Sequence, residues 1–140
     1  MGHAVEVIGP DRFRTVACPT YPEIRLALVP RRRLARLIAA FAPDHLHIAT
    51  EGPLGWSARA WARRNGAAFT TSFHTKFAEY LHARPRIPVA WTYAWLRRFH
   101  APSSAVLAAT PSLRAELARR GFANVRAWTR GVDLALFRPR

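Results

Sequence analysis

The sequence has little cysteine, little negative charge and no long apolar run. Its 140 residues include one cysteine, Cys18, which excludes an internal disulfide and a cysteine-based metal cluster. No stretch approaches the roughly 20 apolar residues that span a bilayer. The residues after Met1 lack the basic start and apolar run of a signal peptide. We therefore expect a cytoplasmic protein.

Lysine and acidic residues are scarce, and arginine dominates the charge. Of 22 basic residues only Lys76 is not arginine, and 8 acidic residues leave a formal net charge of +14. A field of this sign attracts nucleic acid, anionic membrane surfaces or phosphorylated small molecules. The densest cluster, residues 31–33 with Arg36, lies at the start of an expected helix. It is either a solvated helix face or an anion-binding patch.

The length leaves room for one domain with a core, and strand patterns alternate with helix patterns along it. Residues 9–21 have two prolines and no clear period, so we expect a loop there. The expected strands are residues 3–8, 24–29, 45–50, 67–73, 105–110 and 124–129, and the expected helices are residues 30–41, 54–64, 76–81, 89–99 and 111–120. This alternation predicts an α/β fold, a Rossmann-like parallel sheet with helices on both faces.

Polar residues follow three of the expected strands at the end where each strand stops. They are residues 50–52 (TEG), 73–75 (FHT) and 110–112 (TPS). In open α/β sheets, ligands bind outside the carboxyl ends of the strands. The sequence therefore predicts a binding site at this edge of the sheet.

Several phrases are similar to one enzyme family: residues 2–8 (GHAVEVI), 43–55 (PDHLHIATEGPLG), 72–75 (SFHT) with Phe77 and Tyr80, 110–112 (TPS), and 131–133 (GVD) with Phe137 and Pro139. With them the chain resembles the N-terminal half of a GT-B glycosyltransferase of the retaining family 4 kind. Within that family it is most similar to GDP-mannose-dependent α-mannosyltransferases and phosphatidylinositol mannosyltransferases.

The resemblance implies two Rossmann-like domains facing a cleft, of which the N-terminal one binds mainly the acceptor. It implies no metal and no cofactor; the nucleotide sugar is the donor substrate and binds mainly the other domain. The implied site residues are His74 beside the transferring sugar, Glu51, Gly52 and Thr75 on the acceptor side, and Arg130, Gly131 and Asp133 at the junction toward the donor domain.

The resemblance also sets an expected domain organisation. Residues 1–133 correspond to the acceptor-binding domain and residues 134–140 to the start of a linker. The family pattern begins with a strand and a glycine-rich loop and continues into a donor domain, so the sequence reads as truncated at both ends. We therefore expect the isolated chain to be inactive, with a separate donor-domain chain as one potential partner.

The implied function is transfer of a hexose, mannose or glucose, from a nucleotide sugar to a lipid or glycan acceptor. Trp91 and Trp95 lie one helical turn apart and precede two arginines, which suits an anionic membrane surface or a buried core stripe. The first option places the protein peripherally on the inner face of the cell membrane. A basic nucleic-acid-binding module, less favoured because no binding motif is present, and an inactive truncated remnant are the alternatives.

Each site residue also has a purely structural interpretation. His74 could be satisfied by a carbonyl at a strand end, and Glu51 could be an exposed turn residue. Gly52 precedes a proline and could simply start a helix. His45 and His47 share one strand face but have no third ligand at suitable spacing, so structural histidines are favoured over a metal site.

Overall fold

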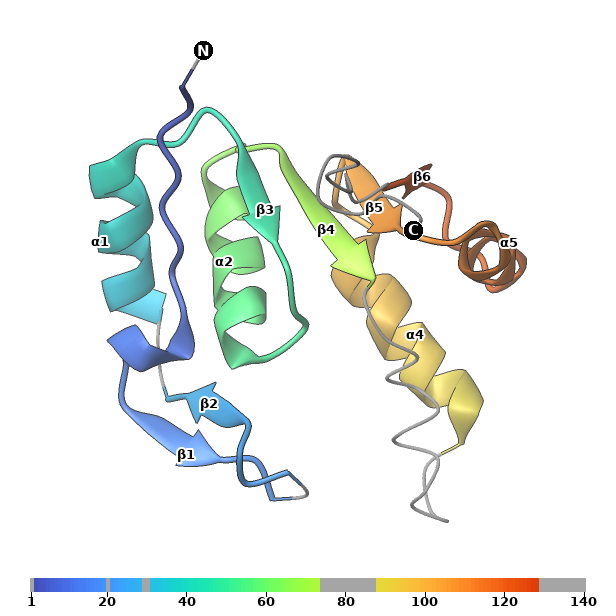
Figure 1. Cartoon of the computed structure of the whole chain (residues 1–140), viewed down its shortest axis with the longest axis horizontal. Helices are drawn as coiled ribbons and strands as arrows, with labels where there is room; N and C mark the ends of the chain where they lie inside the picture. Colours follow the sequence, from blue (N-terminus) through green and yellow to red (C-terminus); the bar gives the residue numbers. More distant parts are fainter. Residues whose placement is uncertain (1, 20, 29–30, 74–87, 129–140) are drawn as a thin grey trace, which may run out of the picture.

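A computed structural model describes residues 2–19, 21–28, 31–73 and 88–128 of the chain (Figure 1). The elements are a 3-10 turn η1 (Pro10–Arg12), β1 (Thr15–Ala17), β2 (Arg25–Ala27), α1 (Arg31–Phe41), β3 (Leu46–Ile48), α2 (Pro53–Arg64), β4 (Phe69–Phe73), α4 (Val89–His100), β5 (Ala105–Ala108), α5 (Pro111–Arg119) and β6 (Val125–Ala127). Strands alternate with helices from α1 onward, as the sequence predicts.

Four strands form one parallel sheet in the order β3-β4-β5-β6. Ile48 of β3 lies opposite Thr71 of β4, and Thr71 lies opposite Val106 of β5. Parallel neighbours joined by helical crossovers are the expected arrangement of an α/β fold. The Rossmann-like parallel sheet is therefore confirmed.

The ends of the helices follow from local residue chemistry. Proline occupies the first turn of α2 and α5, where its missing N–H costs nothing, and Thr110 caps α5 by accepting from the Leu113 N–H. Gly66 and Gly121 follow α2 and α5 with φ of 63° and 83°, the left-handed conformation that glycine adopts without strain. These starts and stops confirm the helices predicted over residues 54–64 and 111–120.

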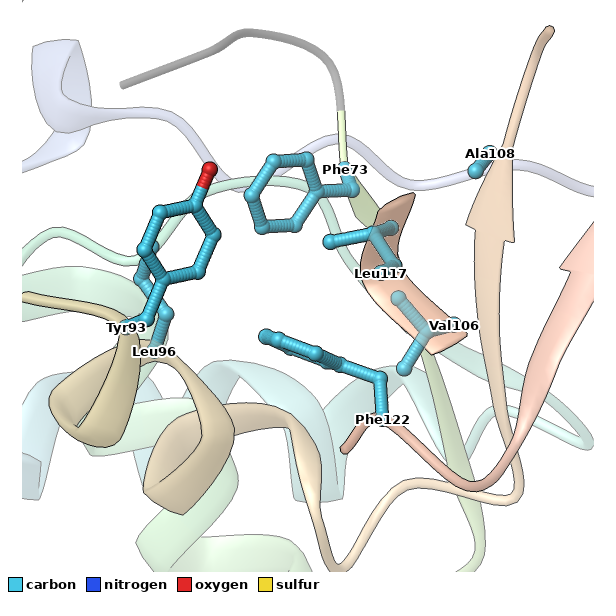
Figure 2. Close-up of a cluster of buried hydrophobic side chains, with 7 residues drawn as sticks. All are labelled: Phe73, Tyr93, Leu96, Val106, Ala108, Leu117 and Phe122. Carbon is cyan, nitrogen blue, oxygen red and sulfur yellow. The ribbon is translucent and has the colours of Figure 1, made fainter. Parts of the chain in front are cut away.

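Two groups of buried apolar side chains hold the helices against the sheet. Figure 2 shows the first, in which α4 and α5 cover the ends of β4 and β5, and the aromatic rings of Phe73, Tyr93 and Phe122 converge with Leu117 and Val106. The second lies where α1 and α2 meet β3 and β4, and it is built from Leu34, Ile38, Ile48, Ala58, Ala62, Phe69 and Phe99. The sheet residues of both groups are alternate residues that point to one face, so α1, α2, α4 and α5 cover that face. The expected second helical layer, on the opposite face, is not found among the described residues.

The prediction for the N-terminal quarter was wrong in three respects. Residues 3–8 are not a strand, and Val5 and Val7 are each 78% exposed. The expected loop over residues 9–21 contains η1 and β1, and the strand expected over residues 24–29 pairs antiparallel with β1 instead of joining the parallel sheet. Figure 1 shows this hairpin below α1, apart from the four-stranded sheet. Alternating valines do not make a strand without a neighbour to pair with.

The helices expected over residues 30–41 and 89–99 are found as α1 and α4, and two predictions on the fold lie outside the described residues. The helix expected over residues 76–81 falls there, and so does the boundary placed after residue 133. Both stay predictions.

Candidate functional site

The carboxyl ends of β3, β4 and β5 lie along one edge of the sheet, because the three strands are parallel and in register. Glu51 follows β3 by three residues, and Gly52 is the residue before the first turn of α2. β4 ends at Phe73, and the turn after β5 begins with Ala109 and Thr110. The sheet edge at which the sequence predicts a site is therefore present, and Glu51 is a described carboxylate there beside β3; the binding site itself stays a prediction.

Glu51 is not an exposed turn residue. Its Oε1 lies 3.1 Å from Nε2 of His100, the last residue of α4, and its side chain is 18% exposed while that of His100 is 1% exposed. The two residues are 49 positions apart in the sequence. The Glu51 carboxylate at the sheet edge is thus hydrogen-bonded to the buried imidazole of His100.

The other side of the imidazole is also hydrogen-bonded. Nδ1 of His100 lies 2.8 Å from Oγ1 of Thr71, which is completely buried in β4. Thr71 Oγ1 lies 3.3 Å from Oγ of Ser103, and Ser103 donates to the His100 carbonyl at 2.7 Å. Asn124 donates an amide N–H to the same Ser103 hydroxyl at 3.1 Å. We call Glu51, His100, Thr71, Ser103 and Asn124 the buried polar chain.

Of the two glycines near Glu51, Gly55 and not Gly52 is sterically required. A Cβ at Gly55 would lie 1.9 Å from the Thr50 carbonyl oxygen, so only glycine lets α2 approach the end of β3 this closely. Gly52 has φ of −69°, and a Cβ there would meet nothing within 4 Å. The helix-starting role of Gly52 is confirmed, whereas its predicted acceptor contact stays a prediction.

Arg59 of α2 binds the end of α4. Its Nε and Nη2 donate to the carbonyls of Phe99 and Arg98 at 2.9 and 2.8 Å. Carbonyls in the last turn of a helix lack helical partners, and a cation there also opposes the negative end of the helix dipole. Burial lowers the pKa of the Arg59 guanidinium, and repulsion from Arg63 and Arg98 lowers it further. An arginine nevertheless stays charged at neutral pH.

His47 lies on the opposite face of the sheet. Its Nδ1 is 2.8 Å from Thr70 Oγ1 and its Nε2 is 3.2 Å from Ser72 Oγ. Both ring nitrogens are therefore engaged by hydroxyls of β4, which supports the structural interpretation. No group of three His, Cys, Asp or Glu side chains placed to hold a metal ion occurs within the described ranges.

The Thr110–Ser112 motif has a structural explanation. Thr110 Oγ1 accepts from the Leu113 N–H at 3.2 Å and lies 3.2 Å from the Ser112 hydroxyl. Arg114, one turn into α5, reaches back to the carbonyls of Ala108 and Ala109 at 3.4 Å each. The motif caps a helix, and it brings an arginine to the site edge.

A second surface combines tryptophan and arginine on α2 and α4. Trp56 and Trp95 lie with ring centroids 5.6 Å apart, and Trp91 is 73% exposed. Arg63 and Arg98 are exposed close by, and neither helix contains a carboxylate. We call these five residues the Trp–Arg surface. The arginines of α1 from Arg31 to Arg33 are also exposed, as a solvated helix face would be.

Five predicted site residues lie outside the described residues: His74, Thr75, Arg130, Gly131 and Asp133. Their roles stay predictions. Sequence reasoning missed His100 and Thr71. The one local signal was a histidine closing an apolar helix immediately before a strand, and it says nothing of a partner 49 residues away.

Known proteins resemble the chain along nearly its whole length. The sequence model of Glycosyltransferase Family 4 matches residues 1–136. A GDP-mannose-dependent alpha-mannosyltransferase of Mycolicibacterium smegmatis is 32% identical over 99% of the chain and 42% of its own length. The protein of the same name in Mycobacterium tuberculosis is 30% identical over 99% and 41%. A sulfoquinovosyl transferase, SQD2 of Arabidopsis thaliana, is 28% identical over 99% and 27%.

The chain spans about two fifths of the length of the two mycobacterial proteins, 42% and 41%. No solved structure is significantly similar to it. The family match covers almost every residue, including the stretch with Glu51 and the segment after β4. The chain therefore belongs to glycosyltransferase family 4.

Proposed function

We propose that this chain forms the acceptor-side part of a glycosyltransferase that moves a hexose, mannose or glucose, from a nucleotide sugar to a lipid or glycan acceptor. Glu51 binds an acceptor hydroxyl at the carboxyl edge of the sheet, with Gly52 and Thr75 beside it. His74 lies next to the transferring sugar, and residues 130–133 lead toward the donor side. The nucleotide sugar binds mainly outside this chain, on a separate donor domain.

The observation that carries this proposal is the fixed Glu51 carboxylate. A carboxylate is acceptor-only when ionised, and its two oxygens accept several hydrogen bonds. His100 engages Oε1, while 18% of the side chain stays exposed at the sheet edge. A sugar acceptor presents hydroxyl donors, so this carboxylate suits it better than a phosphate. Arg114 adds positive charge along the same edge.

Binding can be tested without turnover. The amide signals of the labelled chain would be followed by NMR during separate titrations with octyl α-mannoside, as acceptor probe, and GDP-mannose, as donor probe. We expect the glycoside to shift the amide signals of residues 51, 52, 54 and 55 and GDP-mannose to shift them less. Glu51→Gln should abolish the glycoside response. Equal responses to both probes, or none near Glu51, would contradict the proposal.

The same sample tests the expectation that the isolated chain transfers no sugar. Radiolabelled GDP-mannose and the glycoside would be incubated with the chain, and the product would be separated by chromatography. We expect binding of the glycoside without labelled product. Labelled product would show that this chain carries donor binding as well.

We further propose that the Trp–Arg surface lies against an anionic membrane, on the inner face of the cell membrane. No helix of the described part is long and apolar enough to cross a bilayer. An exposed tryptophan beside arginines, on helices without a carboxylate, suits the boundary between headgroups and acyl chains.

Co-sedimentation tests this surface with phosphatidylcholine vesicles prepared with and without phosphatidylglycerol. Binding should require the anionic lipid, and both Trp91→Ala and Arg63→Gln should weaken it. Arg126→Gln, an exposed arginine on β6, is the matched control and should leave binding unchanged. If Arg126→Gln weakens vesicle binding as much as Arg63→Gln does, binding depends on the overall charge and not on the Trp–Arg surface. Salt-sensitive binding of single-stranded DNA at submicromolar strength would favour the nucleic-acid alternative.

A further inference from the structure

The buried polar chain runs from the interior to the sheet edge, and His100 is its centre. The imidazole is shielded on several sides by aromatic rings, with centroid distances of 5.0 Å to Phe99, 5.6 Å to Phe73 and 5.9 Å to Phe122. A buried polar ring in such surroundings is costly unless both nitrogens are hydrogen-bonded. Glu51 and Thr71 provide those two hydrogen bonds.

The proton positions follow from the partners. An ionised Glu51 carboxylate can only accept, so Nε2 of His100 carries a proton. The Thr71 hydroxyl has one proton, which it donates either to Nδ1 or to Ser103 Oγ. In the first case the imidazole is neutral, and in the second Nδ1 donates to Thr71 and the ring is cationic. In both cases Nε2 donates to Glu51.

The backbone of His100 is fixed as firmly as its ring. Ser103 donates to its carbonyl, and Asn124 donates to the Ser103 carbonyl and hydroxyl. Arg59 holds the two preceding carbonyls of α4. Both the backbone at the end of α4 and the ring of His100 are therefore hydrogen-bonded, which favours one position of the imidazole beside Glu51.

We propose that His100 is a positioning residue that holds the Glu51 carboxylate in one rotamer, so that its remaining acceptor sites face the acceptor substrate. This inference deepens the proposed function and rests on it for the substrate, but the orientation itself is a property of this chain alone. The contact that carries it joins His100 Nε2 to Glu51 Oε1 at 3.1 Å. His100 does not touch the substrate.

Two substitutions separate positioning from a purely structural role. His100→Gln keeps an N–H donor near the place of Nε2, whereas His100→Asn keeps a polar group near Nδ1 and loses the contact with Glu51. The χ1 rotamer of Glu51, read from three-bond NMR couplings, should be single in the wild type and in H100Q and averaged in H100N. A structural role alone would lower stability in both variants without separating their Glu51 rotamers.

Affinity gives the second readout. Octyl α-mannoside should bind H100Q within about twofold of wild type and H100N about tenfold more weakly, the size expected for one hydrogen bond to a charged group. His47→Asn, in β3 and on the opposite face of the sheet, is the matched control and should change neither the Glu51 rotamer nor the affinity.

The outcomes distinguish the two proposals. If the Glu51 rotamer is single in the wild type and averaged in H100N, positioning by His100 is supported. If the same chain does not bind the glycoside, the acceptor role of Glu51 is overturned. Averaged rotamers in the wild type overturn positioning, whatever the affinity, and this measurement needs no variant to fold. If H100N does not fold, Thr71→Val, which removes the Nδ1 partner, should average the rotamer in part; an unchanged rotamer would overturn the inference.

Discussion

Two histidines contact β4 from opposite faces of the sheet, His47 from β3 and His100 from α4. They differ in the partners of their hydrogen bonds and in burial. His47 contacts the hydroxyls of Thr70 and Ser72 and stays exposed, whereas His100 contacts Thr71 and the Glu51 carboxylate and is buried. Both have two engaged ring nitrogens. The described contacts of His100 link the covered side of the sheet to a charged group at the predicted site edge. Partner chemistry and burial, not the number of hydrogen bonds, distinguish a positioning histidine from a surface one.

Replacing each histidine by alanine should give the largest difference in stability between the two residues. His100→Ala leaves a cavity and a partly buried carboxylate without its donor, so we expect a loss of about 3 kcal/mol or more in the free energy of unfolding. His47→Ala removes exposed hydrogen bonds and should cost about 1 kcal/mol or less. Urea denaturation of both variants measures the difference. Equal losses would show that the two histidines are equivalent.

Gly55→Ala tests whether the Glu51 side of the contact depends on how α2 meets β3. The added methyl would collide with the Thr50 carbonyl, and the forced shift should cost about 2 kcal/mol. The Glu51–His100 contact should weaken while the signals of His47 stay unchanged. Chemical shifts of the two rings report both effects, and a wild-type spectrum for G55A would contradict the close approach.

The two threonines of β4 offer a finer comparison because they are neighbours with the same side chain. Thr71→Val removes a buried hydroxyl that serves both His100 and Ser103, and it should cost about 1–2 kcal/mol. Thr70→Val removes a partner of the exposed His47 and should stay within about 0.5 kcal/mol. The same denaturation assay compares them. A larger loss of stability for T70V than for T71V would contradict the view that the face with Thr71 is the more buried one.

Gly52→Ala should have the smallest effect on stability, within about 0.5 kcal/mol, because the backbone angles suit alanine and a Cβ meets open space. Its use lies in the binding assay. Glycoside binding that falls while stability holds would show that the substrate approaches this backbone closely. Unchanged binding would show that Gly52 does not contact the acceptor, and it would leave the proposed role of Glu51 unaffected.

Local chemistry made the helical part of the fold predictable. Proline at the starts of α2 and α5, and glycine after their ends, fix boundaries through backbone geometry that the sequence displays directly. The apolar run of β5 predicts a buried strand, whereas β4 is largely buried although its three central residues are polar. The N-terminal hairpin was not predictable, because pairing between β1 and β2 depends on which strands are available and not on the period of either segment.

The site was only half predictable. The position of the sheet edge, and of Glu51 at it, follows from the rule that parallel strands end at the same edge of a sheet. This rule requires only the order of strands and helices along the sequence. The role of His100 could not be predicted, because its partners Thr71 and Glu51 are set by the tertiary position of α4 and no local sequence signal identifies them. The steric constraint on Gly55 was not predictable either, since it comes from the Thr50 carbonyl across the turn.

The Arg59 contact with α4 has a consequence for how the domain opens. Two carbonyls of the last α4 turn are held by a side chain from the middle of α2, so that turn cannot fray without releasing the guanidinium into solvent. The backbone amides of both helices around this contact should therefore exchange with deuterium as one cooperative unit. Their exchange rates should rise together in Arg59→Met, which keeps the apolar stem and removes the donors.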